Sequence, residues 1–595
     1  MRDPQDIVFE IARHYVADNE ALLGERVAKR ILGWIRSRNI PALSTSRSDE
    51  MTTALQSSNH WRILAQVEAL FKKNSAFSDP TSGAKQAIRS FDKAETLCRI
   101  TNRRLDYYYT HLDRLDPDMR KWCQRAERFV ENVLGESRSF LDTIPGNLRL
   151  TGGATNRRSR REAVPFMKIG NKIACSVGAV PFVETFYQFV GMPLKKVIVT
   201  SWNRVVVVPK NWKTGRTIAA EPEGDLPFQL CFDSYVKRRL LRIGIDLSDQ
   251  FRNQVLALWG SLTGRFATVD FSMASDTAAY NAVAWLFPQK WFEIMQRLRC
   301  THGILQADEN LCLERREWKY AKFSSMGNGM TFTIETLMFA AFAYAVGSKT
   351  ISVYGDDVIV DTEVYEDYCR LAKFFGFVVN QEKSYDKGPF RESCGGDFFL
   401  GDNVTPFYLR EKFGERKADD SHMVNGLASI ADPGGKLEQF LVQFTRERKL
   451  PLVPYCPDST VGVWVAPHLL YDQKILVNRP KKGVSFRGFI AKPRRIHHCK
   501  DYRGYFLWML GVKNRESRSS SANRHSSVRW KIGRALFCEL EDTVKMDIDD
   551  YQSSVWTRSD EITYRRKWIS YRPQPVRKVP DYIYWWTEAI QTIQC

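Results

Sequence analysis

The chain has 595 residues, a formal net charge of +20 and a sequence pI of about 9.4. A hydrophobic share of 44% over this length allows a large core and excludes a disordered or fibrous chain, and roughly 150 residues per domain suggests three or four domains or subdomains. The cationic surplus favours a polyanionic partner, because Lys and Arg displace condensed counterions from phosphates, although a basic surface can also serve solubility alone.

Two classes of protein are disfavoured by local patterns. The twelve cysteines include no pair at C-x-x-C spacing, which argues against zinc-ribbon and thioredoxin-type motifs. The start MRDPQDIVFE carries acids where a signal peptide is basic and then apolar, and the longest apolar stretch, Leu337 to Val346, is too short for a bilayer. We therefore expect a soluble protein in a reducing compartment, with no membrane partner.

Helices dominate the structure expected for residues 1–145. Apolar residues recur at helical spacing in VFEIARHYVADNEALLGERVAKRILGWI and again from Trp122 to Leu134. The tract STSRSDEMTTALQSSN, which lies between them, has the composition of a polar loop.

The next segment, TGGATNRRSRREAVPF (151–166), is rich first in glycine and then in arginine. This composition predicts a loop that faces phosphate, and it also fits a solvated surface loop. The candidate RNA-binding residues of this loop are Arg157, Arg158, Arg160 and Arg161.

Two strands joined by a basic turn are expected between residues 197 and 220. The β-branched runs Val205–Val208 and Thr217–Ala219 flank the cations Lys210, Lys213 and Arg216. The spacing of three residues suits a loop that presents several cations to one polyanion.

Residues 264–400 carry the most informative patterns. GRFATVDFSMASDTAAYNAVAWLF (264–287) predicts a strand, a turn from Asp270 to Asp276 and then a helix. KFSSMGNGMTFTIETLMFAAFAYAVG (322–347) predicts a glycine-rich loop followed by a long helix. ISVYGDDVIVD (351–361) predicts a tight hairpin with Gly355 and Asp356 at its tip.

Three acids follow apolar strands in this region. Asp270 follows RFATV, and Asp356 and Asp357 sit at the hairpin tip. Several carboxylates at hydrophobic strand ends are costly to keep ionised together, and a hard divalent cation such as Mg²⁺ resolves the conflict. Two such ions can support nucleotidyl transfer. The alternative is that Gly and Asp serve turn geometry alone.

A second basic tract lies near the C-terminus, within a region of mixed helical character. Between Arg479 and Arg534 about sixteen Lys and Arg stand against two acids, the footprint expected for nucleic acid. Interleaved aromatic residues could stack on bases, but they fit a core better. The candidate RNA-binding residues here are Lys481, Lys482, Arg494 and Arg495.

The ordered set of patterns resembles the palm motifs of viral RNA polymerases. The sequences of these motifs most resemble those of the replicase β-subunits of positive-strand RNA bacteriophages, the leviviruses. The resemblance covers residues 150–410 and is weaker outside them. It is carried by TGGAT (151–155), VPKNWKTGRTIAAEP (208–222), GIDLSDQ (244–250), ATVDFSMASD (267–276), SSMGNGMTF (324–332), VYGDD (353–357), GPFRESCG (388–395) and VTPFYLR (404–410).

The resemblance implies roles for the acids. Asp270 and Asp356 would be the main ligands of two Mg²⁺ ions, for which Mn²⁺ can substitute, and Asp357 would be a supporting carboxylate. Asp276 resembles the acid that recognises the ribose 2′-hydroxyl. Its structural alternative is an N-cap for the following helix, and both roles can coexist.

The resemblance also implies nucleotide contacts. The SMGNG loop would close around the nascent base pair through Ser325, Gly327, Asn328 and Thr331. The cations Lys210, Lys213 and Arg216 resemble the motif that holds the triphosphate, and Lys383 resembles the lysine that protonates departing pyrophosphate. Many viral polymerases have Asn eight residues after the loop glycine, where this chain has Glu335, so no Asn role is transferred.

The expected fold is α+β, a right hand of fingers, palm and thumb with a small antiparallel palm sheet backed by helices. We assign 1–150 to an N-terminal helical region bridging fingers and thumb, 151–265 to fingers, 266–404 to palm, and 405–595 to thumb and basic C-terminal region. Partners implied by the resemblance are template and product RNA, NTPs, host elongation factors Tu and Ts, and a host RNA-binding ribosomal protein, in the cytoplasm of a bacterial host.

Three other functions stay open at this stage. A reverse transcriptase also uses separated aspartates and a Y-x-D-D turn, but it normally has a bulky aromatic residue near the sugar site, where this chain has Asp276 and SMGNG. A nonenzymatic RNA-binding protein explains the basic tail but not the acids. A metal-dependent hydrolase would cleave RNA rather than release pyrophosphate from NTPs.

Overall fold

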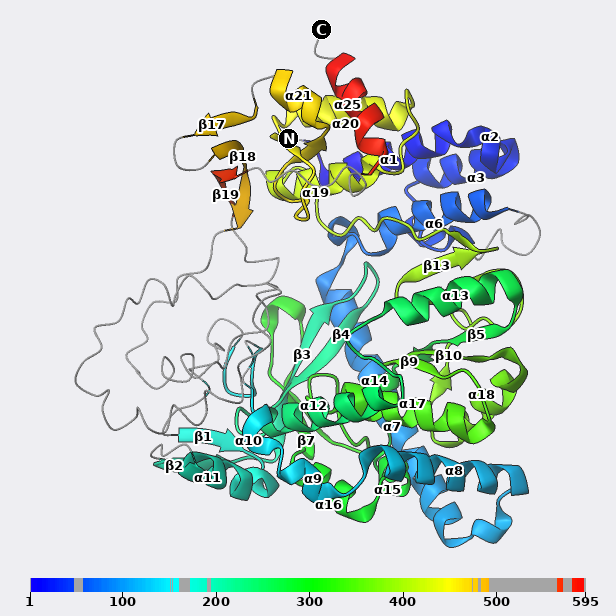
Figure 1. Ribbon diagram of the computed structural model, residues 1–595, viewed down its shortest axis with the longest axis vertical. Coiled ribbons are helices and arrows are strands. Elements are labelled where there is room, and N and C mark those ends of the chain that lie inside the picture. The colour runs from blue at the N-terminus through cyan, green and yellow to red at the C-terminus, as the bar shows by residue number, and fades with distance from the viewer. Residues whose placement is uncertain are drawn as a thin grey trace.

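The protein combines many helices with several small sheets (Figure 1). This arrangement agrees with the expected α+β class. The computed structural model describes residues 2–47, 57–149, 151, 153–159, 168, 172–189, 194–472, 475–479, 483–491, 564–570 and 580–592.

The described residues up to 149 are mainly helical, as the apolar periodicity predicts. Several helices begin at a side-chain cap followed by proline, as in α1, where Asp3 accepts a hydrogen bond from the Gln5 amide ahead of Pro4. The helices are α1 (Pro4–Asp18), α2 (Glu20–Leu23), α3 (Glu25–Arg36), α4 (Ile40–Leu43), α6 (Ser58–Lys72), α7 (Pro80–Thr110), α8 (Pro117–Leu134), α9 (Ser137–Leu141) and α10 (Ile144–Asn147).

Two large hydrophobic cores organise the chain. One joins α1, α3 and α6 to residues from Leu409 onward, so the first and last parts of the chain pack together in the upper part of Figure 1. The other joins α7 and α8 to the central segment up to Phe377. The long helix α7 runs between the parts of the chain that form these two cores. It brings side chains of the N-terminal region to the centre of the molecule.

A three-stranded antiparallel sheet lies in the central core, with strand order β5–β10–β9. Val358 of β10 pairs with Val269 of β5 and with Val353 of β9. Hence the Y-G-D-D hairpin and the strand that precedes Asp270 are neighbours, which confirms the expected juxtaposition. The bounds are β5 (Phe266–Val269), β9 (Ser352–Tyr354) and β10 (Asp357–Asp361).

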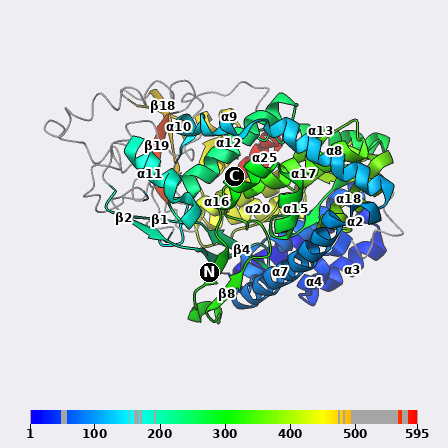
Figure 2. The same cartoon turned by 90° about the horizontal axis from the view of Figure 1, so that it is seen from below.

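Helices cover both faces of this sheet. Val358 and Val360 point into the core shared with α17 (Thr331–Val346) and α18 (Tyr365–Phe374), whereas Ile359 packs on the opposite side with α13 (Phe251–Thr263). This alternation follows from the period of two in a strand. Helix α17 is apolar around its whole circumference and buried nearly throughout; α8 packs along it (Figure 2).

A four-stranded sheet of order β4–β3–β7–β8 carries the basic hairpin. Strands β3 and β4 are antiparallel, and Val208 pairs with Arg216 at the end of the hairpin, as the two β-branched runs predict. Its strands are β3 (Trp202–Pro209), β4 (Gly215–Ala220), β7 (His302–Leu305) and β8 (Arg316–Lys319).

The remaining elements surround these sheets. Central ones are β1 (Lys172–Cys175), α11 (Val180–Phe189), β2 (Lys196–Val199), α12 (Leu226–Arg242), β6 (Phe271–Ser272), α14 (Ala274–Thr277), α15 (Tyr280–Leu286), α16 (Gln289–Arg297), β11 (Val378–Val379), β12 (Phe390–Ser393), β13 (Gly396–Phe399) and β14 (Asp402–Asn403). C-terminal ones are α19 (Lys417–Ala428), α20 (Lys436–Glu447), β15 (Leu452–Pro454), β16 (Val463–Val465), α21 (Pro467–Asp472), β17 (Val477–Arg479), β18 (Gly483–Ala491), β19 (Tyr564–Ser570) and α25 (Tyr582–Thr592).

Two absences concern only the described ranges. No helix in them has both the length and the apolar character needed to cross a membrane. The cysteines among the described residues are free thiols, in agreement with the absence of paired motifs in the sequence.

Candidate active site

Three aspartates lie at one end of the central sheet. Asp270 directly follows Val269, which pairs with Val358, so Asp270 comes level with Asp357 across the two strands. Gly355 makes the turn of the hairpin with φ +65°, and a side chain there would overlap the Phe332 ring. The tight turn places Asp356 next to Asp357 and near Asp270.

Asp270 is fixed by the segment that follows β11. The Asn380 Nδ2 donates a hydrogen bond of 2.8 Å to Asp270 Oδ2, and the Ser384 hydroxyl accepts from the Asp270 amide at 3.1 Å. Burial raises the pKa of Asp270, and the charge of Asp356 adds to this rise, while Lys383 and Asn380 oppose it. Asp356 is therefore close enough for its charge to act on Asp270.

Asp357 is partly buried at the start of β10. Burial raises its pKa to about 7, and the negative charges of Asp356, Glu392 and Asp270 act in the same direction. A hydrogen bond with the Cys394 backbone opposes the shift. Near neutral pH this carboxylate therefore gains from a nearby cation.

These carboxylates fit a divalent metal by their chemistry. They are hard oxygen donors on adjoining strand ends, and burial penalises their charges without a cation. Within the described residues, however, no three His, Cys, Asp or Glu side chains converge into a ready-made ligand shell. Mg²⁺ commonly completes its shell with water and substrate phosphates, so an incomplete protein shell is compatible with it.

Lysine 383 lies next to the acids. Its Nζ is 3.9 Å from Asp270 Oδ2, and its side chain is 47% exposed. Burial lowers the pKa of Lys383, but the charges of Glu392 and Asp270, with smaller contributions from Asp357 and Asp356, outweigh it and raise the pKa overall. Lys383 is thus a protonated group with access to solvent beside the carboxylates.

The basic hairpin brings two of its three cations to the same place. Desolvation lowers the pKa of Lys210, the charges of Arg216 and Lys383 lower it further, and Asp270 and Asp356 oppose this. Lys210 and Arg216 are therefore neighbours of the carboxylate group. Lys213 lies in the exposed turn, where Asn211 Oδ1 accepts hydrogen bonds from the Lys213 and Thr214 amides.

The loop before α17 is tied to the basic hairpin. The Ala219 amide donates to the Met326 carbonyl at 2.7 Å, and Gly327 has φ +112° with the Ala219 carbonyl 2.2 Å from where a Cβ would be. Only glycine fits here.

The polar residues of this loop are buried, and two of them hold its shape. Thr331 Oγ1 donates to the Ser325 carbonyl at 2.9 Å, and Asn328 Oδ1 accepts from the Met330 amide. Contact between these residues and a nucleotide stays a prediction.

The N-cap alternative for Asp276 is wrong. Asp276 lies inside α14, whose N-cap is Met273, and the cap of α15 is Ala279. Its carboxylate instead pairs with Lys322, whose Nζ is 2.9 Å from Asp276 Oδ1.

Glu335 is a buried acid on the otherwise apolar α17. The Ser275 hydroxyl donates to Glu335 Oε2 at 2.9 Å. Burial raises the pKa of Glu335 well above its ordinary value, and the charges of Asp356 and Asp276 contribute. Glu335 thus lies between the hairpin tip and the sugar-site candidate.

Sequence reasoning assigned no role to Glu392 or Asn380, which both act on the aspartates. Glu392 lies on β12 next to Arg391, which is buried and donates to the carbonyls of Phe266 and Gly388. The alternation of a strand turns Glu392 away from Arg391, toward Asp270 and Asp357. The available signal was the strand pattern within GPFRESCG, which is weak on its own.

Of the candidate RNA-binding residues, the structure describes only Arg157 and Arg158. Arg157 and Arg158 lie in a loop anchored by the Thr155 hydroxyl, which donates to Glu223 at 3.1 Å; Arg157 is 4.0 Å from the same acid. The residues Arg160, Arg161, Lys481, Lys482, Arg494 and Arg495 lie outside the described residues.

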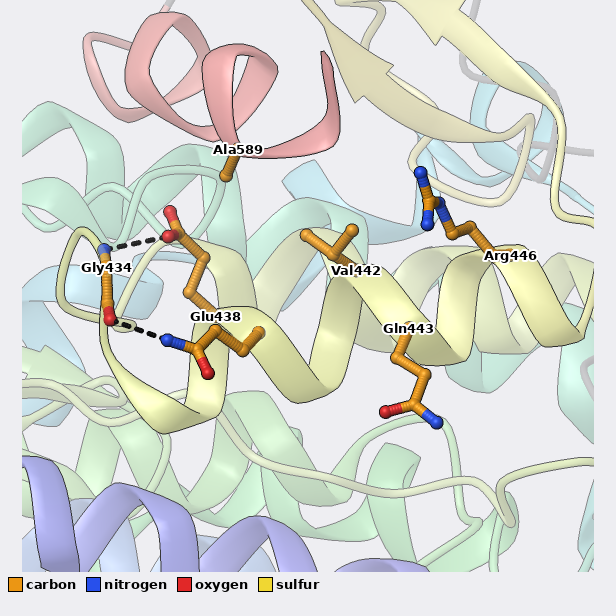
Figure 3. Close-up of a pocket in the computed structure, with 7 residues that line it drawn as sticks. Gly434, Glu438, Val442, Gln443, Arg446 and Ala589 are labelled. Carbon is orange, nitrogen blue, oxygen red and sulfur yellow. Dashed lines mark hydrogen bonds between the residues drawn. The ribbon is translucent and has the colours of Figure 1, made fainter. Parts of the chain in front are cut away.

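A separate cavity of about 680 Å³ lies between α20 and α25 (Figure 3). Its buried carboxylate, Glu438, accepts a hydrogen bond from the Gly434 amide at 2.8 Å, and Arg446 lies farther along the same helix. None of the residues predicted for the active site lines it. The aspartates and this cavity are therefore distinct features.

Curated relatives match more than half of the chain. It is 36% identical over 350 residues to the RNA-directed RNA polymerase subunit beta of Qbeta virus (strain MX1), a match covering 58% of each chain. It is 38% identical over 336 residues to that of Enterobacteria phage SP, covering 54% of this chain and 56% of the relative. The beta chain of Enterobacteria phage GA is 30% identical over 395 residues, covering 63% and 71%. The chain thus spans little more than half the length of the first two relatives.

Solved structures show a weak likeness. The RNA-dependent RNA polymerase of BmCPV at the elongation state has a TM-score of 0.36 and 9% identity, covering 62% of this chain and 36% of that one. The RNA-dependent RNA polymerase of a human picobirnavirus has a TM-score of 0.29 and 14% identity, covering 41% and 55%. These scores are too low to support a comparison of folds.

A model of one protein family matches most of the chain. The family model for the RNA replicase beta-chain matches residues 26–426, which is more than half of the 595 residues. The chain belongs to the family of RNA replicase beta-chains.

Proposed function

We propose that the chain catalyses RNA-templated synthesis of RNA from ribonucleoside triphosphates, and so replicates the genome of a positive-strand RNA phage. The observation that carries the proposal is that Asp270 and the Asp356–Asp357 turn lie at adjoining strand ends, with Lys210, Arg216 and Lys383 around them. Membership of the replicase beta-chain family and the polymerase names of the curated relatives support it.

Asp270, Asp356 and Asp357 would hold two divalent cations, Mg²⁺ or in its place Mn²⁺. When bound, the cations would neutralise charge on the attacking 3′-oxygen and on the leaving phosphate. Asn380 keeps the Asp270 carboxylate in one orientation through its 2.8 Å hydrogen bond. Such fixed positioning supplies much of the rate of phosphoryl transfer.

The cations of the site would handle the triphosphate. Lys210 and Arg216 bind its phosphates at the end of the hairpin, while attack of the 3′-oxygen on the α-phosphorus breaks the bond to pyrophosphate. Lys383, protonated and partly exposed, gives a proton to the departing pyrophosphate. Asp276 accepts a hydrogen bond from the ribose 2′-hydroxyl. The loop residues Ser325, Gly327, Asn328 and Thr331 shape the wall that faces the nascent base pair.

The right-hand arrangement follows from the same reasoning. Residues 266–404 would form the palm around the central sheet, 151–265 the fingers with the basic hairpin, and 405–595 the thumb and basic C-terminal region. The core that joins α1, α3 and α6 to residues after Leu409 supports residues 1–150 as the bridge between fingers and thumb.

The partners of the protein would be RNA, NTPs and host proteins in the cytoplasm of a bacterium. Arg157, Arg158 and the basic tract that begins at Arg479 would contact RNA phosphates. Host elongation factors Tu and Ts and a ribosomal RNA-binding protein are the proposed protein partners. Affinity purification from a bacterial lysate should retain both elongation factors, and a preparation that contains neither would contradict this part of the proposal.

The test of the activity is templated incorporation of labelled NTPs with Mg²⁺ at matched RNA binding. Wild type is compared with Asp356→Asn and with the control Asp402→Asn, which removes an exposed acid on β14. We expect wild type and the control to extend RNA and release pyrophosphate, and Asp356→Asn to lose activity by about 10³-fold or more.

Full activity of Asp356→Asn would contradict the assignment of the site. Use of dNTPs in place of NTPs would indicate a reverse transcriptase, and cleaved RNA without pyrophosphate would indicate a hydrolase. An inactive wild type is tested again with bacterial lysate, because a missing host protein gives the same result.

A further inference from the structure

A lysine is completely buried beside the sugar-site candidate. The Lys322 side chain is 0% exposed, and its Nζ lies 2.9 Å from Asp276 Oδ1 and 3.4 Å from Glu95 Oε1. The same ammonium lies 3.4 Å from the centre of the Phe91 ring. Burying an ammonium is costly unless it is paired, so the two carboxylates and the ring face compensate for lost hydration.

Glu95 and Phe91 belong to α7, so the N-terminal helical region reaches this site. The backbone of the segment that carries Lys322 is held from several sides. Glu95 Oε2 accepts from the Ala321 amide at 2.7 Å, and Asn102 Nδ2 donates to the Ala321 carbonyl at 2.7 Å. Arg299 donates to the Lys322 carbonyl at 3.1 Å. Lys322 therefore has little freedom to follow a moving carboxylate.

Asp276 remains accessible on one side. Its side chain is 15% exposed, and Lys322 pairs with Oδ1. Oδ2 accepts no hydrogen bond from any residue within the described ranges. Glu335 accepts a hydrogen bond from the neighbouring Ser275 and lies close enough for the charge of Asp276 to raise its pKa, after the larger effects of burial and Asp356. The ion pair with Lys322 thus fixes one oxygen and leaves the other for a ligand.

We propose that Lys322, held by Glu95, is a positioning residue that fixes Asp276 for recognition of the ribose 2′-hydroxyl. Lys322 touches no reacting atom in this scheme. This inference rests on the proposed polymerase function and names the side chains that set its choice of sugar. A deoxyribonucleotide would leave Asp276 Oδ2 without a hydrogen-bond donor, which is the arrangement that gives large discrimination.

A purely structural role for the Lys322 ion pairs predicts a different outcome. Loss of local structure slows incorporation of NTPs and dNTPs alike. Loss of positioning lowers incorporation of NTPs more than that of dNTPs, so the ratio of the two kcat/KM values falls. The ratio is therefore the quantity to measure.

The experiment measures single-nucleotide incorporation of an NTP and the matching dNTP on the same template by the full chain. Lys322→Met removes the ammonium, and Lys319→Met removes an exposed lysine three residues away as control. We expect the NTP:dNTP ratio to fall about 10-fold or more in Lys322→Met and to stay unchanged in Lys319→Met. Combining Lys322→Met with Asp276→Ala should add little to the fall caused by Asp276→Ala alone.

Glu95→Gln provides a second test of the inference if Lys322→Met does not fold. Glutamine can still accept the Ala321 amide but no longer pairs its charge with Lys322, and we expect the ratio to fall about 3-fold or more. A ratio equal to that of wild type in the folded variants, with both rates reduced in parallel, would overturn the inference. A wild type that incorporates neither nucleotide even after bacterial lysate is added would instead overturn the proposed function.

Discussion

The segment from Asp270 to Asp276 places two carboxylates beside two lysines in very different surroundings. At the end of the sheet, Lys383 is 47% exposed and 3.9 Å from Asp270. In the interior, Lys322 is fully buried and 2.9 Å from Asp276, with Glu95 on its other side. The loose pair leaves both partners able to exchange contacts with a substrate. The tight pair fixes its aspartate, so we assign chemistry to the first region and recognition to the second.

Removal of the carboxylate at the sheet end should have the largest effect. Asp270→Asn is expected to lower templated incorporation by about 10³-fold or more, because the amide cannot serve as an anionic metal ligand. RNA binding should be retained, and filter binding checks this. Activity within about 10-fold of wild type would show that Asp270 is not required for the chemistry.

The two lysines should differ sharply in their effect on stability. Lys322→Met leaves the buried Glu95 and the largely buried Asp276 without their cation and is expected to lower the free energy of unfolding by about 3–5 kcal/mol. Lys383→Met removes a partly exposed, longer ion pair and should change it by less than about 1 kcal/mol. Urea denaturation of the two variants measures the difference. Equal losses would contradict the distinction between the regions.

The two lysines should also differ in kinetics. Lys383→Met is expected to lower kcat by about 10- to 100-fold with little change in KM, because it removes a proton donor rather than a binding contact. Lys387→Met is the matched control, since Lys387 is a more exposed lysine four residues away. A change in KM alone would assign Lys383 to substrate binding instead.

The basic hairpin offers a finer comparison. Lys210 is close enough to Asp270 and Asp356 for their charges to affect its pKa, whereas Lys213 lies in the exposed turn. Lys210→Ala should raise KM for NTPs by about 10-fold, and Lys213→Ala by less than about 2-fold. Steady-state titrations with each NTP check this. A larger effect of Lys213→Ala would mean that the hairpin binds phosphate through its tip.

The smallest expected effect concerns pH and metal. The folded state raises the pKa of Asp357 to about 7, so it binds that proton more tightly than the unfolded chain does. The contribution of Asp357 to stability therefore falls as pH rises from about 4 to about 7. At pH 8, Asp357→Asn should raise Tm by about 1–3 °C without metal, and Mg²⁺ should stabilise wild type more than the variant. Asp402→Asn should show neither difference.

Much of the central region could be predicted from sequence. The hairpin, the strand before Asp270, the basic turn and the long apolar helix each follow from a local period or turn signal, and the structure has all four. These signals arise within single elements. The order of these motifs along the chain and their resemblance to a family then predicted that the aspartates share one site.

The surroundings of Asp276 could not be predicted in the same way. Its partner Lys322 is 46 residues away in sequence, and Glu95, the second partner of that lysine, is 181 residues away from Asp276. Neither lies in a pattern that suggests an ion pair. The N-cap interpretation relied on local propensity, and tertiary pairing with Lys322 replaced it. Glu392 was missed for the same reason, because only the tertiary packing of β12 near β5 and β10 brings it close to the aspartates.

Iron-mediated cleavage tests most directly the central claim that Asp270 and Asp356 share a divalent metal. Fe²⁺ replaces Mg²⁺, ascorbate and peroxide generate radicals at the bound ion, and mass spectrometry maps the cuts. We predict cuts near both residue 270 and residues 356–357, suppressed by excess Mg²⁺, lost in Asp270→Asn and Asp356→Asn, and kept in Asp402→Asn. Cuts at only one of the two places, or cuts that persist in both variants, would contradict the claim.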